Sequence, residues 1–340
     1  MKKLWLSFLI LFLLSGALTG CGNSYSSQLS SFAPPEEKRL VIYTSHKEDV
    51  YGPIVEEFQA RTGIWAEVVT GGTGELLDRI WKEKTSPQAD VMFGGGVESL
   101  LAYASCFEPY LCSDVSRFKP GLVQGEGLYT PFSSLPFVLI YNTRLVTPGD
   151  LTGWADLLDS RWKGRIAFAD PAISGSSYTA AVTMLSALPG DRWENLSSFY
   201  ANLDSIVLED SGDVTGKVAS GSLSIGITLE QTALTAMAQG AGIGIVYPEE
   251  GTSILPDATA LIAGAAHREN ALAFLEFVQG TDVQELVVNR FSRRSVRTDV
   301  ADRPDLPPID TLTVIRYNIA DASALKEEFL QRWESLRKEG

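Results

Sequence analysis

The sequence predicts an α/β protein of two lobes with a ligand cleft between them. In the first part of the chain, short apolar segments alternate with amphipathic segments in the order β-α-β-α-β-α. A second alternation begins after Pro131, and later segments return to the first lobe, so the chain crosses between the lobes more than once. The 340 residues are enough for one large or two ordinary domains with apolar cores. Clefts between such lobes are where small ligands bind.

The N-terminal 1–20 segment has the parts of an export signal. Lys2 and Lys3 precede the apolar run of residues 4–14, and small residues lead to Cys21. The apolar run is shorter than the roughly 20 residues that a membrane span needs. This pattern resembles the signal of bacterial lipoproteins, and the resemblance implies that Cys21 is lipidated and becomes the first residue of the mature chain.

The 21–38 segment is predicted to be a flexible tether. It is rich in serine and contains Pro34 and Pro35, so it has little to bury in a core. We therefore expect an extracytoplasmic protein that is attached to the membrane by its lipid anchor.

The charge of the chain limits its partners. Removal of Lys2 and Lys3 lowers the 28 basic residues to 26, against 42 acidic ones, a net charge of −16. Such a surface argues against nucleic acid or anionic lipid as a partner. A small anionic solute remains compatible, because local N–H groups can hold it.

The first lobe is predicted to contain three strand–helix units. The strands are residues 40–43, 65–69 and 90–93, and the helices lie around residues 54–58, 75–84 and 100–101. Each strand runs into small or polar residues. Ligands bind outside the carboxyl ends of strands in open α/β sheets. The candidate contacts at these turns are Thr44, Ser45, His46, Thr73, Gly74 and Gly95.

The second lobe is predicted from shorter elements. We expect strands at residues 137–141, 166–168, 206–208 and 224–228, and a short helix at 154–158. A strand at 243–247 is expected to lead back to the first lobe, before a helix at 270–278 and a final helix from Ser323 with an apolar stripe. The predicted boundaries are 39–132 and 246–297 for lobe 1, and 133–245 and 298–340 for lobe 2.

The most informative segment of the second lobe is 165–185. It predicts a strand, an Asp-Pro turn and a helix that begins among hydroxyl groups and a glycine. Such a helix start offers N–H and O–H donors and a positive dipole end to an anion. The candidate residues are Ser174, Gly175, Ser176, Ser177 and Tyr178. The alternative is that Ser174 or Ser176 merely caps an ordinary helix.

Together, the turns of both lobes predict a clamp that holds an anion through hydrogen bonds without a lysine. Asp210 and Glu230, at the ends of second-lobe strands, are candidates for amino or hydroxyl groups of the ligand, or else are solvated surface acids. The basic run Arg293, Arg294 and Arg297 either reaches the ligand or pairs with surface acids.

Catalytic motifs are scarce. The sequence has neither H-E-x-x-H nor G-x-S-x-G, and adjacent residues at a strand end, such as Ser45 and His46, point in opposite directions. We therefore expect neither an enzyme nor a cofactor.

The cysteines and histidines predict no metal site. With Cys21 lipidated, Cys106 and Cys112 either form a small-loop disulfide or remain two buried thiols. Only His46 and His267 could complete a zinc site, so we expect none.

Several blocks of sequence resemble one family. They are LVIYTSHKEDVYGPIVEEFQARTG, ADVMFGGGVESL, YNTRLV, RWKGRIAFADPAISGSSYTA, ITLEQTA and VYPEEGT. Together they resemble the solute-binding component of ABC importers, in the branch shared by ferric-iron, phosphoglycerate, hexose-phosphate and 2-aminoethylphosphonate binding proteins. The resemblance extends from about Leu40 to about Val300.

This resemblance implies a type II periplasmic-binding-protein-like fold. Its lobes would close by a hinge around a small solute and deliver it, as a monomer, to a membrane permease. In some relatives the partner is a membrane histidine kinase, which makes a ligand sensor the alternative.

The resemblance also implies roles for single residues. Ser45, Thr73 and Ser176 would meet phosphate or phosphonate oxygens, and Glu230, with Asp210, the other end of the ligand. Ferric-iron members use two adjacent tyrosines where this chain has residues 229–232. An organophosphate or organophosphonate is therefore expected, and iron stays open through Tyr178, Tyr247 and Glu230.

Overall fold

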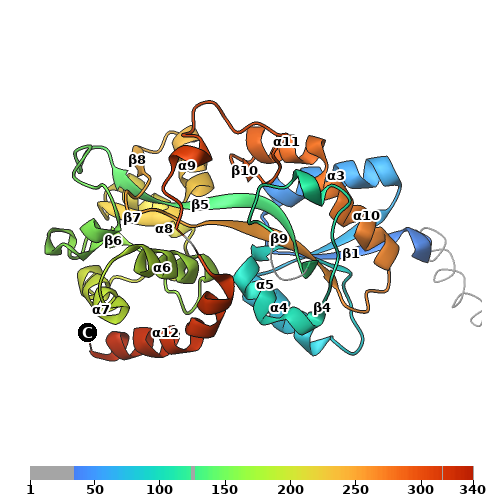
Figure 1. Ribbon diagram of the computed structural model, residues 1–340, viewed down its shortest axis with the longest axis horizontal. Helices are drawn as coiled ribbons and strands as arrows, with labels where there is room; N and C mark the ends of the chain where they lie inside the picture. The colour runs from blue at the N-terminus through green and yellow to red at the C-terminus, as the bar shows by residue number, and fades with distance from the viewer. Residues whose placement is uncertain (1–33, 124–126, 316, 340) are drawn as a thin grey trace, which may run out of the picture.

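The computed structural model describes residues 34–123, 127–315 and 317–339. The predicted export signal, Cys21 and most of the predicted tether lie outside the described residues. Within them, the strands form one ten-stranded mixed sheet whose main path runs β2-β1-β3-β9-β5-β7-β6. Figure 1 shows two α/β lobes joined by the long strands β5 (Thr130–Asn142) and β9 (Ile254–Ile262).

Lobe 1 is built around the parallel strands β1 (Arg39–Thr44), β2 (Trp65–Thr70) and β3 (Val91–Gly96), with β9 antiparallel to β3. Residues of β1 alternate between the two faces of the sheet. Ile42 packs with α3 (Glu48–Thr62), α10 (Arg268–Gln279) and α11 (Thr281–Asn289). Tyr43 packs on the other face with α4 (Thr73–Lys82) and α5 (Val97–Ala102). Lobe 1 thus has a core on each face of the sheet.

Lobe 2 is built on the other half of β5, which pairs with β7 (Ile225–Leu229) and β8 (Ile243–Val246). The short β6 (Ile166–Ala167) extends the sheet beyond β7. One face is covered by α6 (Gly175–Ala187), α7 (Arg192–Leu203) and α12 (Ile319–Glu339), and the other by α8 (Asp213–Ser220) and α9 (Glu230–Ala238).

The remaining short elements connect these layers. They are β4 (Phe107–Glu108), β10 (Arg294–Ser295) and the 3-10 helices Glu36–Lys38, Ala104–Cys106, Val115–Arg117, Trp154–Leu158, Ser160–Trp162 and Ile309–Thr311. Within the described residues, no helix has both the length and the apolar character that a membrane crossing requires.

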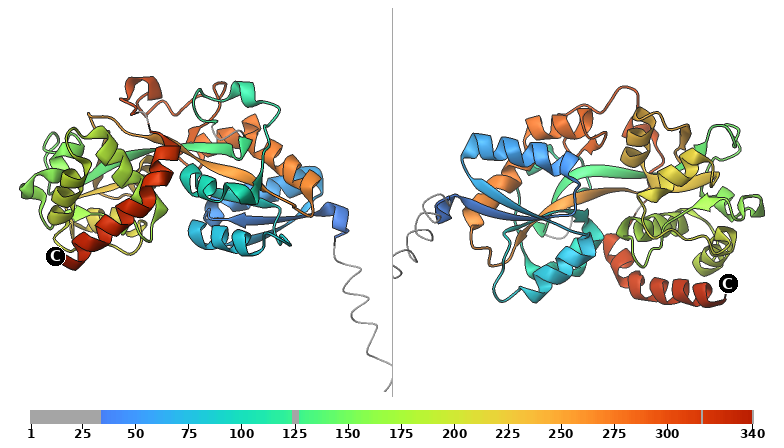
Figure 2. Two further views of the ribbon diagram at one scale, coloured as in Figure 1. Left: turned by 60° about the horizontal axis from the view of Figure 1, so that its bottom comes forward. Right: turned by 180° about the vertical axis from the view of Figure 1, so that it is seen from behind.

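Helix α12 contacts both lobes. Ile319, at its first turn, is buried in a core cluster of lobe 1, whereas Phe329 and Trp333 are buried in the core of lobe 2. Figure 2 shows the helix running from the junction of the lobes along the outside of lobe 2. The preceding segment contacts lobe 1, where Thr298 donates its backbone N–H to Arg117 O.

Two predictions about the strands are wrong. Residues 206–208 form no strand beyond an isolated bridge of Leu208 with Ala169, because the backbone turns at Asp204 and Ser205, where φ is positive. Residues 243–246 do not return to lobe 1 but pair with β5 inside lobe 2. The return crossing is made by β9, which the sequence reading missed.

The candidate disulfide does not form in the structure. Cys106 and Cys112 are both free and buried. Cys106 packs in the cluster that includes α4 and α5, and Cys112 in the cluster that includes α3 and α10. The two thiols therefore belong to cores on opposite faces of the lobe 1 sheet.

Candidate functional site

A pocket of about 210 Å³ lies in lobe 2, with Lys47, just before α3, as its contribution from lobe 1. The lining residues are Lys47, Phe137, Phe168, Ser176, Ser177, Ala180, Asp210, Ser211, Gly212, Ile227, Thr228, Leu229 and Thr232. A second, more open hollow is lined by Ile173, Ser174, Glu209, Asp210 and Ser211. The two hollows share Asp210 and Ser211, so they form one continuous depression.

The start of α6 forms one side of this depression. Ser174 is the N-cap, and its Oγ accepts the backbone N–H of Ser177 at 3.3 Å. Its Oγ also lies 3.0 Å from Ser176 Oγ, which in turn donates to Ser211 Oγ at 3.3 Å. The hydroxyls are therefore linked to one another next to the positive end of a helix dipole. Ser174 is a helix cap, and the same helix start also lines the pocket.

Other hydroxyls of the pocket have no partner within the described residues. Ser177 is 5% exposed and Thr228 is 8% exposed, yet neither side-chain oxygen makes a hydrogen bond there. The hydroxyl of Thr232, which is partly exposed, is equally free in that part of the chain. Because these hydroxyls are not committed to an internal partner in the described part of the chain, they are available to donate to the acceptor oxygens of a ligand.

The rest of the pocket is apolar. Phe137 and Phe168 are buried aromatic residues on this side, and Ala180, Ile227 and Leu229 complete the wall. A pocket with apolar walls and a few polar groups suits a ligand that carries a carbon skeleton beside its polar group.

The predicted turns of lobe 1 come together, but the residues they contain do not line this pocket. A Cβ on Gly94 would lie 2.9 Å from Ser45 Oγ, and a Cβ on Gly95 would lie 2.7 Å from Thr73 Cγ2. Both glycines have positive φ, so the close approach depends on their lack of a side chain. Gly74 is exposed beside Thr73.

Thr44 and His46 are parts of the interior. Thr44 is fully buried and donates its hydroxyl to Phe93 O at 2.7 Å. The ring of His46 packs against Phe93 and Phe132, and its Nε2 lies 3.5 Å from Asp257 Oδ2. Burial, with the nearby Arg293, lowers the pKa of His46 to about 4, although Asp257 opposes the shift. His46 is therefore neutral at pH 7, inside lobe 1.

Glu230 is also used internally. It is 1% exposed and accepts hydrogen bonds from Arg294 Nε and Nη2, at 2.8 and 2.7 Å, and from the hydroxyl of Tyr247 at 2.6 Å. Tyr178 donates to Ala322 O and packs its ring against Phe329. The structure thus does not bring Glu230, Tyr247 or Tyr178 to the pocket.

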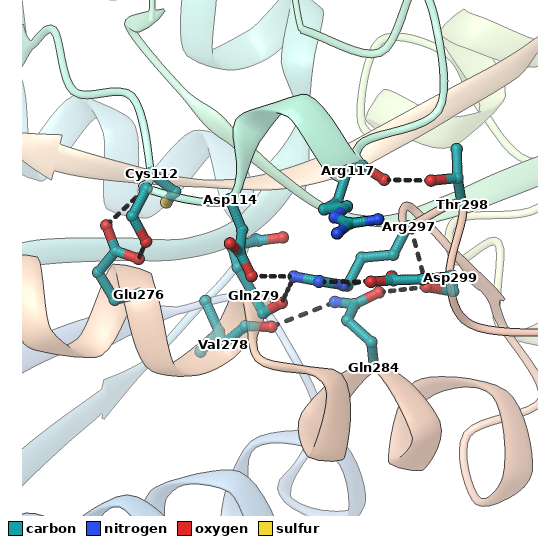
Figure 3. A network of polar contacts seen from close by, with 12 residues as sticks. Cys112, Asp114, Arg117, Glu276, Val278, Gln279, Gln284, Arg297, Thr298 and Asp299 are labelled. Carbon is teal, nitrogen blue, oxygen red and sulfur yellow. Dashed lines mark hydrogen bonds and ion pairs between the residues drawn. The ribbon is translucent and has the colours of Figure 1, made fainter.

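The basic run pairs with acids, and two of these are buried. Arg294 pairs with Glu230, and Arg293 with Asp257. Figure 3 shows the third arginine, Arg297, between Asp114 and Asp299. Of the two alternatives for the basic run, pairing with acids is what the structure shows, but the carboxylate partners of Arg293 and Arg294 lie in the interior and not at the surface.

Of the predicted contacts, Ser176, Ser177 and Asp210 line the pocket, and Ser174 lines the adjoining hollow. Gly175 sits at the same helix start, where Ser99 Oγ of lobe 1 lies 3.8 Å from the position of a Cβ.

The sequence reading missed Lys47, Ser211, Thr228 and Thr232. Lys47 directly follows the predicted turn at residues 44–46, and Thr228 ends a predicted strand, so both had a local signal. The prediction of an anion site without a lysine stays a prediction, and the structure adds Lys47 to the residues that line the pocket.

Comparisons with known proteins complete the description. Residues 40–289 match the model of a family described as Bacterial extracellular solute-binding protein. The chain is 23% identical over 287 residues to Iron uptake protein A1 of Synechocystis sp., covering 79% of each chain. It is 25% identical over 256 residues to the Putative 2-aminoethylphosphonate-binding periplasmic protein of Salmonella typhimurium, covering 72% of this chain and 73% of that one.

A solved structure shows the same fold. The periplasmic binding protein AfuA from Actinobacillus pleuropneumoniae, with exogenous fructose-6-phosphate bound, aligns with a TM-score of 0.79 at 23% identity. The alignment covers 88% of this chain and 98% of AfuA. The described residues therefore adopt the periplasmic-binding-protein fold.

Proposed function

The chain belongs to the bacterial extracellular solute-binding proteins, and on this basis we propose that it captures a small organophosphate or organophosphonate for an ABC importer. The main support is a set of pocket hydroxyls on two elements: Ser177 of α6 and Thr228 of β7 are buried residues whose side chains make no hydrogen bond in the described part of the chain. The proteins named in the comparisons bind solutes, so we propose that the ligand is released unchanged.

A phosphate or phosphonate group suits this donor set. Its terminal oxygens accept several hydrogen bonds at once, and neutral donors at a helix N-terminus are a common way to hold such a group. The apolar wall at Phe137 and Phe168 would contact the carbon skeleton. Asp210, which lines both hollows, would meet an amino or hydroxyl group. The names of the Salmonella relative and of the AfuA structure support the same ligand class.

Ferric iron is the second candidate, because one relative is named an iron uptake protein. Hard Fe³⁺ prefers anionic oxygen ligands. Tyr178, Tyr247 and Glu230 could supply such ligands only after giving up their internal contacts. The phosphorus ligand needs no such rearrangement.

Titration calorimetry tests the proposal. The protein is titrated with 2-aminoethylphosphonate, glucose 6-phosphate, 3-phosphoglycerate, inorganic phosphate and ferric citrate. We expect saturable binding of at least one of the organic phosphorus compounds. A ligand present at a hundredfold excess over its Kd should stabilise the protein by about 2.7 kcal/mol. Binding of ferric ion alone would overturn the proposal in favour of iron.

We also propose that the protein is held outside the cytoplasm by a lipid on Cys21 and works as a monomer with a membrane permease. Metabolic labelling with palmitate should mark the wild type and not Cys21→Ser. Label in both, or in neither, would contradict the anchor.

A further inference from the structure

We infer that Lys47 binds the anionic group of the ligand from lobe 1, opposite the hydroxyls of lobe 2. This inference rests on the proposed function and adds to it a residue that sets specificity for charge. Because Lys47 and the hydroxyls come from different lobes, an anion bound to both would also hold the lobes together.

The position of Lys47 is fixed by the helix that follows it. Lys47 is the N-cap of α3, and its carbonyl oxygen accepts the backbone N–H groups of Val50 and Tyr51 at 3.0 and 3.1 Å. Its side chain is exposed and lines the pocket. Among the described residues that line the pocket, Lys47 is the sole cation and the sole contribution from lobe 1.

Local stability does not explain a lysine here. N-caps favour Ser, Thr, Asp or Asn, whose oxygens accept the first free N–H groups, and Lys47 makes no such bond. A positive charge also opposes the helix dipole at this end. Within the described residues, Lys47 has no ion pair with a carboxylate. A residue that breaks a local rule without structural compensation is expected at functional sites.

The opposite wall offers what an anion needs. Ser177 and Thr228 are more than nine-tenths buried and both line this pocket, and their hydroxyls make no hydrogen bond in the described chain. The start of α6 adds its positive dipole end. In a protein with a strong net negative charge, a local cation also offsets the repulsion of an anionic solute.

An alternative role for Lys47 is to pair with Asp210. Asp210 is exposed and lines the same pocket, so Lys47 and Asp210 would attract each other if the lobes approached. In that role the lysine would act on lobe closure and not on the anion. The two roles predict opposite effects of Asp210→Asn: loss of affinity if Lys47 acts through the carboxylate, and equal or tighter binding of inorganic phosphate if Lys47 binds the anion.

The experiment compares the wild type with Lys47→Met, Asp210→Asn and the control Lys82→Met, which removes an exposed lysine of lobe 1 outside the pocket. Calorimetry is carried out with 2-aminoethylphosphonate, glucose 6-phosphate and inorganic phosphate at two salt concentrations. We expect Lys47→Met to weaken binding about ten- to a hundredfold and to reduce its salt dependence. Lys82→Met should bind like the wild type.

Lys47→Ser provides a second readout. It should lose affinity as Lys47→Met does, while its unfolding temperature stays the same or rises, because serine is a good N-cap. A variant that is both more stable and weaker in binding cannot be explained by misfolding.

The outcomes separate the inference from the proposed function. If the wild type binds a probe and Lys47→Met binds it within twofold, the inference is wrong and the proposed function stands. Equal losses in Lys47→Met and Asp210→Asn for inorganic phosphate would assign Lys47 to lobe closure, which also overturns the inference. If the wild type binds none of the phosphorus compounds, both fail.

Discussion

Two polar regions of this molecule differ in how their groups are satisfied. Where β5, β9 and β10 meet, each buried charge faces an opposite one, as in Glu230 with Arg294 and Asp257 with Arg293. In the pocket, Thr228 is buried without a hydrogen bond within the described residues. The comparison shows that polarity and burial do not identify a binding site. The lack of a hydrogen bond alone does not identify one either, because Arg293 Nε and Arg294 Nη1 of the paired region are buried without a hydrogen bond among the described residues. What distinguishes the pocket is that its unpaired hydroxyls belong to residues that line a hollow.

The paired region holds segments of the two lobes together. Arg294 lies on β10, which pairs with β5, and Glu230 begins α9 of lobe 2. Their contact joins residues 64 positions apart. These charges therefore stabilise the fold, whereas the unpaired groups of the pocket are available to a ligand.

The largest effect is expected from breaking the buried pair. Arg294→Met leaves Glu230 charged and buried with Tyr247 as its remaining donor, which should lower the free energy of unfolding by about 3–5 kcal/mol. Urea denaturation measures the loss. The double variant Arg294→Met/Glu230→Met should recover most of it, because no charge is left uncompensated. If the free energy of unfolding of Arg294→Met lies within 1 kcal/mol of the wild-type value, the ion pair does not contribute to the stability of the fold.

Lowering the pH should destabilise the protein through the buried His46. Since the folded pKa of His46 is about 4 and the ordinary value is 6.5, the unfolded chain binds the proton first as pH falls. Compared with His46→Gln, the free energy of unfolding of the wild type should fall by up to about 3 kcal/mol as pH is lowered from 6.5 to 4. Above pH 6.5 the difference between the two proteins should not change with pH. Denaturation at several pH values measures this difference.

His267 is the matched control for this experiment. Burial lowers its pKa, but hydrogen bonds with Asp90 and Glu36 outweigh burial, and the net shift is upward. Its contribution to stability is therefore present at low pH and is lost as pH rises through the folded pKa. His267→Gln should change the pH dependence in the direction opposite to His46→Gln. If the pH dependence of the free energy of unfolding changes in the same direction in both variants, the opposite pKa shifts assigned to the two histidines are wrong.

A pair of identical substitutions tests the two regions directly. Thr228→Val removes a free hydroxyl of the pocket and should weaken ligand binding about tenfold, or about 1.4 kcal/mol, without lowering stability. Thr252→Val removes a buried hydroxyl that donates to Phe137 O at 2.8 Å. It should lower stability by about 1 kcal/mol and leave binding unchanged. Calorimetry and thermal unfolding measure both effects. A loss of stability in Thr228→Val, or a loss of affinity in Thr252→Val, would contradict these roles.

The smallest effect is expected for a pocket hydroxyl that already has a partner. Ser211 accepts a hydrogen bond from Ser176 at 3.3 Å. Ser211→Ala should therefore weaken binding by about 0.5 kcal/mol, close to twofold, which calorimetry can resolve in repeated titrations. A loss larger than that of Thr228→Val would reverse the proposed order of the hydroxyls.

Local patterns predicted the elements that depend on local sequence. The strands β1, β2 and β3 and the start of α6 are close to their expected positions, since apolar periodicity and an N-cap are visible within a few residues. β5 was predicted only from Phe137, because Pro131 and Pro136 interrupt its first half and favour a loop assignment.

The distinction between free and paired groups could not be read from the sequence. In the sequence, Glu230 looks like an accessible acid at a strand end. Only the structure shows that Arg294 pairs with it. Lys47 looks like one exposed lysine among many until α3 directs it to the pocket. Both outcomes depend on contacts between distant segments, for which a single sequence contains no periodic signal.

The position of β9 has a consequence for the order in which the protein can fold during synthesis. β9 lies between β3 and β5, and α12 completes the core of lobe 2. Neither lobe can therefore complete its core until the last third of the chain has been made, and lobe 2 must wait for the final helix. Such distant contacts slow folding. We therefore expect folding to be completed only after α12 has been made.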